Sequence, residues 1–232
     1  MYDVGSPVQL PGCLDSVARL EVLSLTAEDL VKTELYAQER RRRQSKEQAE
    51  QSGEDSRDYL LSLGMRMSIG LNDVAHLARL AQLTKKTNQF TLTTRRYNEQ
   101  QVQEFIREPD WLVAHFSLAD TFGDSGIVGL ALIHIVTPER AELDSFLMSC
   151  RVIGREAESA FLHTLLRRLV EAGIKEVVAS YIPTPKNVLV ENFLPAQDFE
   201  KCADGSYRRD LVKAPPKAES DFPITVDVSA GS

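Results

Sequence analysis

Along residues 88–212, the spacing of the apolar residues changes repeatedly between the one typical of strands and the one typical of helices. Runs of alternating or continuous apolar residues predict strands over 90–94, 111–118, 126–134, 143–150 and 176–182. Helical spacing predicts helices over 98–107 and 155–172, the second ended by Gly173. A further helix is expected over 186–195 and a hairpin over 199–211. Strands alternating with helices in this way predict an α/β fold.

The first 84 residues follow a different pattern. Thr26 and the acidic residues after it predict the start of a long, exposed helix that runs into the forties. A short apolar helix around 59–63 and a strand over 65–69 follow, and Asn72 is expected to cap a second amphipathic helix. Residues 1–84 therefore predict a mainly helical unit with some strand, and 85–212 form the α/β domain. The polar, proline-containing segment 213–232 is expected to be a disordered tail.

Composition narrows the possible partners. The 232 residues are 43% hydrophobic and 26% charged, with a net charge of −7, which argues against a general nucleic-acid binder. The four arginines at 40–43 are surrounded by glutamates, so we interpret them as one solvated helix face. No apolar run is long enough for a membrane span and no secretory leader is evident, so we expect a cytoplasmic protein. Three cysteines without metal-ligand spacing indicate free thiols and no metal site.

Cys150 is the main candidate for chemistry. It ends a predicted strand just ahead of a predicted helix, between Arg151 and Arg155. Positive charge and a helix N-terminus favour a thiolate there, and a thiolate is a nucleophile. The alternative is a small residue packed in the core, since free cysteines are often buried.

His115 is the candidate base for Cys150. If the strands at 111–118, 126–134 and 143–150 pair in sequence, Cys150 lies opposite Ile127 and His115 opposite Gly129. The two side chains then share one face of the sheet, although a slip of one residue would separate them. A core or rim histidine is the alternative.

The order of elements, with the segment Arg151–Glu156 after the fourth strand, resembles the GNAT acyltransferase fold. That family carries a glycine loop at this point, and the resemblance implies that Arg151, Gly154 and Arg155 bind the phosphates of CoA or of a phosphopantetheine arm through a helix N-terminus. Glu156 departs from the loop pattern. Asn187 begins the helix that flanks the pantetheine arm in GNAT proteins, so its amide either binds that arm or caps the helix.

Three longer blocks are similar to the FkbH-like family: residues 83–97 (LTKKTNQFTLTTRRY), 146–155 (FLMSCRVIGR) and 181–187 (YIPTPKN). Members of that family join a phosphatase-like domain of the haloacid dehalogenase (HAD) type to a GNAT-like domain. The resemblance implies that residues 1–84 are the C-terminal remnant of a HAD-like domain and that 85–212 form the acyltransferase-like domain. It also implies passage of a glyceryl or related hydroxyacyl unit, as a thioester, to an acyl carrier protein in polyketide precursor biosynthesis.

Two departures from these families affect the expected activity. The HAD motif Asp-x-Asp-x-Thr is absent, so the acyl group would be prepared by another polypeptide, such as a separate HAD-like phosphatase half. Leu194 stands where GNAT proteins often carry a tyrosine whose hydroxyl acts as an acid. We therefore expect an acyltransferase that works through Cys150. An acetyl-CoA-dependent N-acyltransferase and a non-catalytic module that docks a carrier protein are the alternatives.

Overall fold

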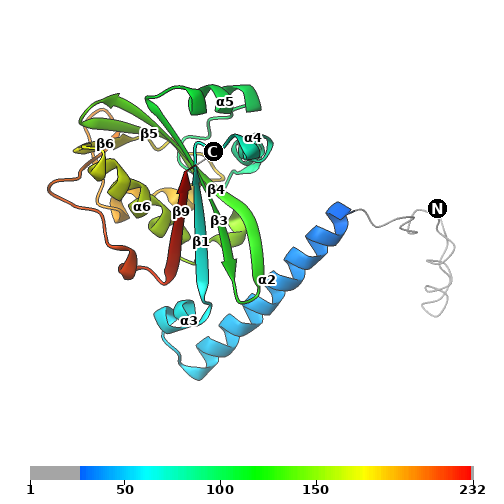
Figure 1. Cartoon of the computed structure of the whole chain (residues 1–232). Coiled ribbons are helices and arrows are strands. Elements are labelled where there is room, and N and C mark those ends of the chain that lie inside the picture. The colour runs from blue at the N-terminus through cyan, green and yellow to red at the C-terminus, as the bar shows by residue number, and fades with distance from the viewer. Residues whose placement is uncertain (1–26, 231–232) are drawn as a thin grey trace, which may run out of the picture. The chain divides into compact units, whose positions relative to one another are not determined.

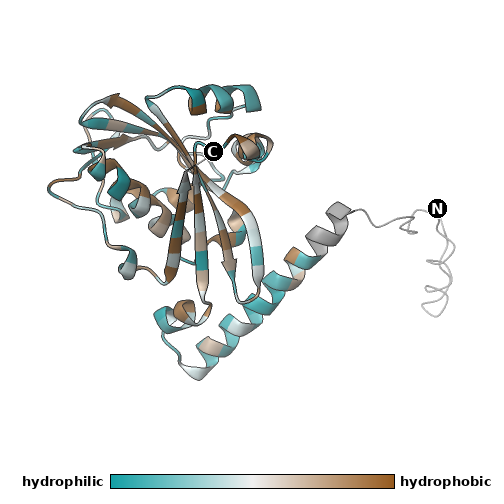
Figure 2. Ribbon diagram, in the orientation of Figure 1, coloured by the Kyte–Doolittle hydropathy of each residue, from teal (hydrophilic) through white to brown (hydrophobic). Residues whose placement is uncertain are grey.

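The computed structural model describes residues 27–230, with side chains from 34 to 229. The chain divides into two units, residues 1–41 and 42–232, and each is described by itself. The predicted cap Thr26 and the cysteine Cys13 lie outside the described residues. Helix α2, which runs through both units, is hydrophilic over most of its described length (Figure 2).

Helices and strands occupy the positions that follow (Figure 1). The α-helices are α2 (Ala27–Ser52), α3 (Ser56–Ser62), α4 (Leu77–Lys86), α5 (Glu99–Arg107), α6 (Ala157–Glu171) and α7 (Phe193–Ala196). Short 3-10 helices are η3 (Val74–His76), η4 (Cys150–Val152), η5 (Val188–Val190) and η6 (Glu219–Asp221). The strands are β1 (Met65–Leu71), β2 (Phe90–Thr91), β3 (Trp111–Asp120), β4 (Gly123–Thr137), β5 (Arg140–Met148), β6 (Glu176–Ala179), β7 (Glu200–Lys201), β8 (Tyr207–Asp210) and β9 (Ile224–Ala230).

One mixed sheet joins these strands in the order β7-β8-β6-β5-β4-β3-β1-β9, with β2 paired to β5. Strands β3, β4 and β5 are consecutive antiparallel neighbours, and β6 returns parallel to β5 through α6. The prediction of an α/β fold is confirmed, and the sheet is mixed, with antiparallel and parallel pairs. The predicted helix over 186–195 is replaced by the two short helices η5 and α7.

The predicted domain boundary at residue 84 is wrong. Strand β1 pairs antiparallel with β3 from Arg66↔Ala119 to Leu71↔Ala114, so it belongs to the same sheet as the α/β domain. Residues 65–71 alternate between core and solvent at their start and are fully apolar-packed at their end, which suits a strand inside a sheet. No separate helical HAD-like remnant is seen within the described part of residues 1–84.

The prediction that residues 213–232 form a disordered tail is also wrong over most of that segment. Strand β9 lies parallel to β1 in register from Met65↔Ile224 to Leu71↔Ala230, and the two run side by side as red and cyan arrows in Figure 1. Ile224, Val226 and Val228 alternate with polar residues and pack toward the main core. This period of two is a strand signal that the prolines and polar residues before it obscured.

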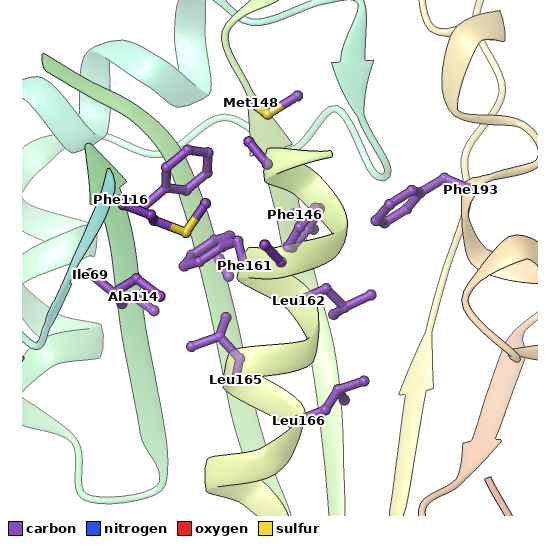
Figure 3. Packing of buried hydrophobic residues seen from close by; sticks show 14 of the residues in the cluster. Ile69, Ala114, Phe116, Phe146, Met148, Phe161, Leu162, Leu165, Leu166 and Phe193 are labelled. Carbon is purple, nitrogen blue, oxygen red and sulfur yellow. The ribbon is translucent and has the colours of Figure 1, made fainter. Parts of the chain in front are cut away.

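Each face of the sheet has its own apolar core. On one face α6 packs Phe161, Leu162 and Leu165 against the strands, and Phe146 lies stacked on Phe193 with ring centroids 5.4 Å apart (Figure 3). The opposite face is covered by α4 and α5. Its core consists of Leu80, Leu83, Val102, Val113, Leu130, Leu132 and Leu147.

The pairing of β5 with β4 contains a β-bulge. Ser145 pairs with Leu132 and Leu143 pairs with Ile133, so Asp144 is an extra residue in β5. The parallel pairing of β5 with β6 ends at Leu143↔Ala179, next to this bulge. From there the two strands diverge.

The segment Phe90–Leu92 fills the wedge between β5 and the chain that continues β6. Phe90 and Thr91 pair with Met148 and Leu147 of β5, and the Leu92 amide donates to the Phe146 carbonyl at 3.1 Å. On its other side the Leu92 carbonyl accepts a hydrogen bond of 2.8 Å from the Ile182 amide. The backbone groups that β5 would leave unpaired in the wedge are therefore satisfied by the chain itself.

Candidate functional site

Cys150 lies exposed at the first position of η4, directly after β5. The Ser149 amide donates to the Val128 carbonyl at 2.7 Å, so β5 is held to β4 up to the residue before the thiol. The predicted register was one residue off, because Phe116 and not His115 lies opposite Gly129. Of the two readings of Cys150, the exposed thiol is the one observed and the packed core residue is not.

The thiol opens into a pocket of about 680 Å³. Three parts of the chain line it: α4 with the loop after it, the end of β5 with η4, and the loop before η5. The lining residues are Arg79, Leu83, Lys86, Thr87, Asn88, Gln89, Met148, Ser149, Cys150, Arg151, Pro185 and Lys186.

All charged residues of this lining carry positive charge. Arg79, Lys86, Arg151 and Lys186 are basic, and the lining contains no aspartate or glutamate. In a chain with a net charge of −7, basic residues without acidic neighbours point to a site for an anion. We call these four residues the basic set.

Arg79 makes more side-chain hydrogen bonds than the other members of the basic set. Its Nε and Nη2 donate to the Ile127 carbonyl at 3.0 and 2.7 Å, and its Nη1 donates to Gln82 Oε1 at 2.6 Å. All of these acceptors are neutral, so the positive charge of the guanidinium is not cancelled. Burial lowers the pKa of Arg79, and the positive charge of Arg151 lowers it further. Arg151 is positioned by a hydrogen bond of 3.3 Å from its Nε to Ser149 Oγ.

His115 does not reach the thiol. It lies on β3 between Gly70 and Leu130, with its ring over Gly70, where an added Cβ would come within 2.4 Å of Nε2. Leu130 pairs with Leu147, so two strand spacings and three further residues separate His115 from Cys150, about 14 Å by standard strand dimensions. His115 is not part of the pocket lining. The expectation that it takes the proton of Cys150 directly is wrong for this geometry.

The surroundings of His115 explain its state. Its Nε2 is 3.5 Å from Asp73 Oδ2, and its ring meets that of His76 edge-on at 5.4 Å. Burial lowers the pKa of His115 more than the Asp73 carboxylate raises it, so the ring is neutral near pH 7. Among the side chains described, from residue 34 to 229, no three His, Cys, Asp or Glu gather as metal ligands would.

Arg155 faces away from the pocket. It is buried, and its Nη1 lies 3.2 Å from Asp120 Oδ2, while its Nη2 donates to the Arg151 carbonyl at 2.7 Å. Arg42 bonds the same carboxylate through Nε at 2.7 Å. Arg155 therefore anchors the loop to the β3–β4 hairpin, which corrects its expected role in binding a phosphate. Arg42, buried in the same cluster, likewise departs from the solvated face predicted for residues 40–43.

The glycine loop is unsuited to an anion. Gly154 has the left-handed φ of +80° that the turn requires, but Glu156 and Glu158 flank the start of α6. The Glu158 Oε2 atom is buried without a hydrogen-bond partner among the described residues, and burial raises the pKa of this carboxyl. Two carboxyl groups at a helix N-terminus occupy the place where a phosphate would be stabilised.

Asn187 is fully used inside the protein. Its Oδ1 accepts hydrogen bonds from the Thr184 amide and hydroxyl at 2.7 and 2.9 Å. Its Nδ2 donates to the Thr91 and Ile182 carbonyls at 2.9 and 3.0 Å. The buried side chain has no donor or acceptor left for a pantetheine arm. Of the expected ligand-binding residues, the structure places only Arg151 in the pocket with Cys150.

Sequence reasoning missed Arg79, Lys86 and Lys186. Arg79 and Lys86 lie seven residues apart on α4, a spacing of two helical turns that places them on one side of the helix. That spacing was visible in the sequence. Their meeting with Lys186, a hundred residues away, depends on how α4 packs over β5.

No protein-family model and no curated protein matches this chain. Among solved structures, Ard1 from Thermoplasma volcanium is 13% identical over 62% of this chain and 97% of its own, with a TM-score of 0.48. A GNAT-family acetyltransferase from Staphylococcus aureus is 12% identical over 62% and 99%, with a TM-score of 0.49. The PaiA N-acetyltransferase from Thermoplasma acidophilum, solved with coenzyme A, is 16% identical over 61% and 98%, with a TM-score of 0.41. At this identity the similarity concerns the backbone arrangement alone.

Proposed function

We propose that this chain is an acyltransferase of GNAT-like architecture in which the Cys150 thiol carries the acyl group. The observation that supports this most strongly is an exposed thiol at the end of β5 inside a pocket lined by the basic set. Cationic surroundings favour the thiolate, which is the reactive form in acyl exchange.

The proposed reaction is an exchange between thioesters. The Cys150 sulfur attacks the carbonyl carbon of a donor thioester, a new S–C bond forms, and the donor's S–C bond breaks. The donor thiol leaves with the proton that Cys150 gave up, and an acceptor thiol reverses these steps. Because Cys150 is exposed and His115 is remote, the proton passes through water. Donor and acceptor thioesters have similar energies, so positioning and a thiolate are what the protein must supply.

The acyl unit and its acceptor are proposed from the sequence blocks similar to the FkbH-like family. Two of those blocks, 83–97 and 146–155, supply pocket residues on both sides of the thiol, and the third, 181–187, supplies Lys186. This agrees with a glyceryl or related hydroxyacyl unit delivered to the phosphopantetheine arm of an acyl carrier protein. A separate HAD-like protein would prepare the unit.

The test is direct labelling of the thiol. The protein is incubated with glyceryl-phosphopantetheine thioester or with a glyceryl-loaded carrier protein, and its intact mass is measured before peptide mapping. We expect one acyl adduct on Cys150 and none on Cys202, which is the matched free thiol in the described chain. Equal labelling of the Cys150→Ala variant would contradict the proposal.

An acetyl-CoA-dependent N-acyltransferase is the second candidate. It is favoured by the sheet order, in which antiparallel β3, β4 and β5 are followed by α6 and the parallel β6. The buried Leu194, which has no proton to donate, weighs against it. Calorimetry with acetyl-CoA, followed by assay of amine acceptors with the Cys150→Ala variant, separates the two. Direct transfer to an amine would survive loss of the thiol.

A further inference from the structure

We propose that the basic set binds a phosphate group of the acyl-bearing substrate, and that this site replaces the glycine loop at the start of α6. The site comprises Arg79 and Lys86 of α4, Arg151 of η4 and Lys186 of the loop before η5. The anion site itself follows from charge and geometry. Its assignment to a substrate phosphate rests on the proposed acyl transfer.

The first support is the absence of counter-charges. The pocket lining has no carboxylate, and within residues 34–229 none of the four basic side chains is within ion-pair distance of one. Several other basic residues of the domain are paired, such as Arg42 and Arg155 with Asp120 or Arg140 with Glu176. Four cations facing one cavity repel one another, and an anion with more than one negative charge relieves that repulsion.

The second support is the placement of Arg79. Its backbone-held guanidinium is partly buried, and burial lowers its pKa, with the positive charge of Arg151 lowering it further. Holding two like charges close together costs a protein stability, and such pairs commonly bind a ligand of opposite charge. An arginine held by hydrogen bonds, with two lysines in the same lining, suits the three or four oxygens of a phosphate.

The third support is that the glycine loop is unsuited to binding a phosphate. Glu156 and Glu158 place carboxyl groups at the start of α6, and Arg155 is turned toward Asp120. A phosphate there would meet these carboxyl groups, whereas the pocket that Cys150 lines offers it only basic charged residues. The phosphate and the reacting thioester would thus be bound on the α4 side of the strand end.

The anion site can be tested without any acyl transfer. Iodoacetate and iodoacetamide alkylate the same sulfur with loss of iodide, but only iodoacetate carries a negative charge. The ratio of their rates at Cys150 therefore reports local charge, and any change in the thiolate fraction cancels. We expect the Lys86→Gln and Lys186→Gln variants each to lower this ratio about twofold to fivefold at low ionic strength.

Lys85→Gln is the matched control, because Lys85 is the exposed neighbour of Lys86 in the last turn of α4 and does not line the pocket. It should leave the ratio unchanged. Inorganic phosphate should slow iodoacetate at Cys150 more than chloride does at equal ionic strength. A ratio that is the same in all variants, or that falls equally with Lys85→Gln, would overturn the anion site.

The source of the phosphate is resolved by comparing acyl donors. Acylation of Cys150 is measured with glyceryl-phosphopantetheine, with glyceryl-pantetheine lacking the phosphate, and with glyceryl-CoA. We expect the phosphorylated arm to react about tenfold faster than the unphosphorylated one, and Lys86→Gln to reduce that preference. Equal rates for the first two donors would overturn the substrate assignment while leaving acyl transfer intact. If no donor acylates Cys150 but the alkylation ratios hold, the proposed function fails and the anion site stands.

Discussion

The side-chain amide of Asn187 donates a hydrogen bond of 2.9 Å to the backbone carbonyl of Thr91, 96 residues earlier in the chain. This contact fastens the segment Phe90–Leu92 in the wedge that opens where β5 and β6 diverge. The same asparagine organises the turn around Thr184. The wedge is therefore closed by the protein itself. The pocket that remains open lies at the strand end, beside Cys150.

Replacing Asn187 with alanine should destabilise the fold. The substitution leaves the Thr91 and Ile182 carbonyls and the Thr184 donors without their partner, at a cost of about 2–3 kcal/mol. Urea unfolding followed by circular dichroism measures this loss. Asn192→Ala is the control, since Asn192 is exposed and makes no side-chain cap bond. If the two variants were equally stable, Asn187 would have no such role.

Asp120 holds two buried arginines, so the Asp120→Ala variant should lose more unfolding free energy than Asn187→Ala. Its side chain is fully buried and accepts bonds from both Arg42 and Arg155. Removing one member of a buried ionic cluster typically costs about 3–5 kcal/mol, because the remaining charge stays out of water. The Asp124→Ala variant of the same hairpin, which loses one exposed turn bond to Gly126, should cost less than about 1 kcal/mol. Thermal and urea unfolding of the two variants should separate them clearly.

The stability of the protein should fall as the pH is lowered below 6.5, partly through His163. Burial and the charge of Arg209 lower the pKa of His163 from 6.5 to about 4, and its Nδ1 accepts a hydrogen bond from the Lys217 amide at 2.9 Å. The folded state thus favours the neutral ring. The stabilisation is complete above pH 6.5 and is lost as the pH falls through about 4.

The unfolding free energies of wild type and His163→Asn are compared at pH 7.0 and 5.0. We expect the wild type to be the more stable at pH 7.0 and its advantage to shrink at pH 5.0. An advantage that is constant across this range would show that His163 is not protonated differently in the folded and unfolded states.

Glu158→Gln should stabilise the protein at neutral pH. Burial raises the pKa of Glu158, with the nearby Glu156 carboxylate adding to the shift, so the folded state favours the protonated form. A raised acid pKa gives stability that is present at low pH and lost as the pH rises through the folded value. The glutamine should gain about 1 kcal/mol at pH 7 and nothing below pH 4. A loss of stability at pH 7 would mean that the carboxylate stabilises the helix start instead.

Much of the sheet could be predicted because its strands have strong local patterns. The predicted strands at 111–118, 126–134 and 143–150 correspond to β3, β4 and β5, and the predicted helix at 155–172 to α6. The consecutive pairing on which the placement of His115 and Cys150 depended is also observed, since short turns leave little alternative.

What could not be predicted depends on contacts between distant residues. The irregularities near Ser117 shifted the register of His115 against β4, and the local apolar pattern marks neither them nor the bulge and wedge beside β5. The strand predicted at 90–94 pairs over only two residues because it enters that wedge. For the site, Cys150 was found from its position at a strand end, whereas Arg79 and Lys186 meet it only once α4 has packed on β5.

The central claim is that Cys150 carries the acyl group between two thiols. Its most direct test is a rapid-quench experiment in which the protein, a glyceryl-phosphopantetheine donor and an acceptor carrier protein are mixed, and the masses of all three are followed. We expect acyl-Cys150 to form and decay at least as fast as the product appears, and the Cys150→Ala variant to yield no product. Product formation at the wild-type rate in that variant would contradict the account.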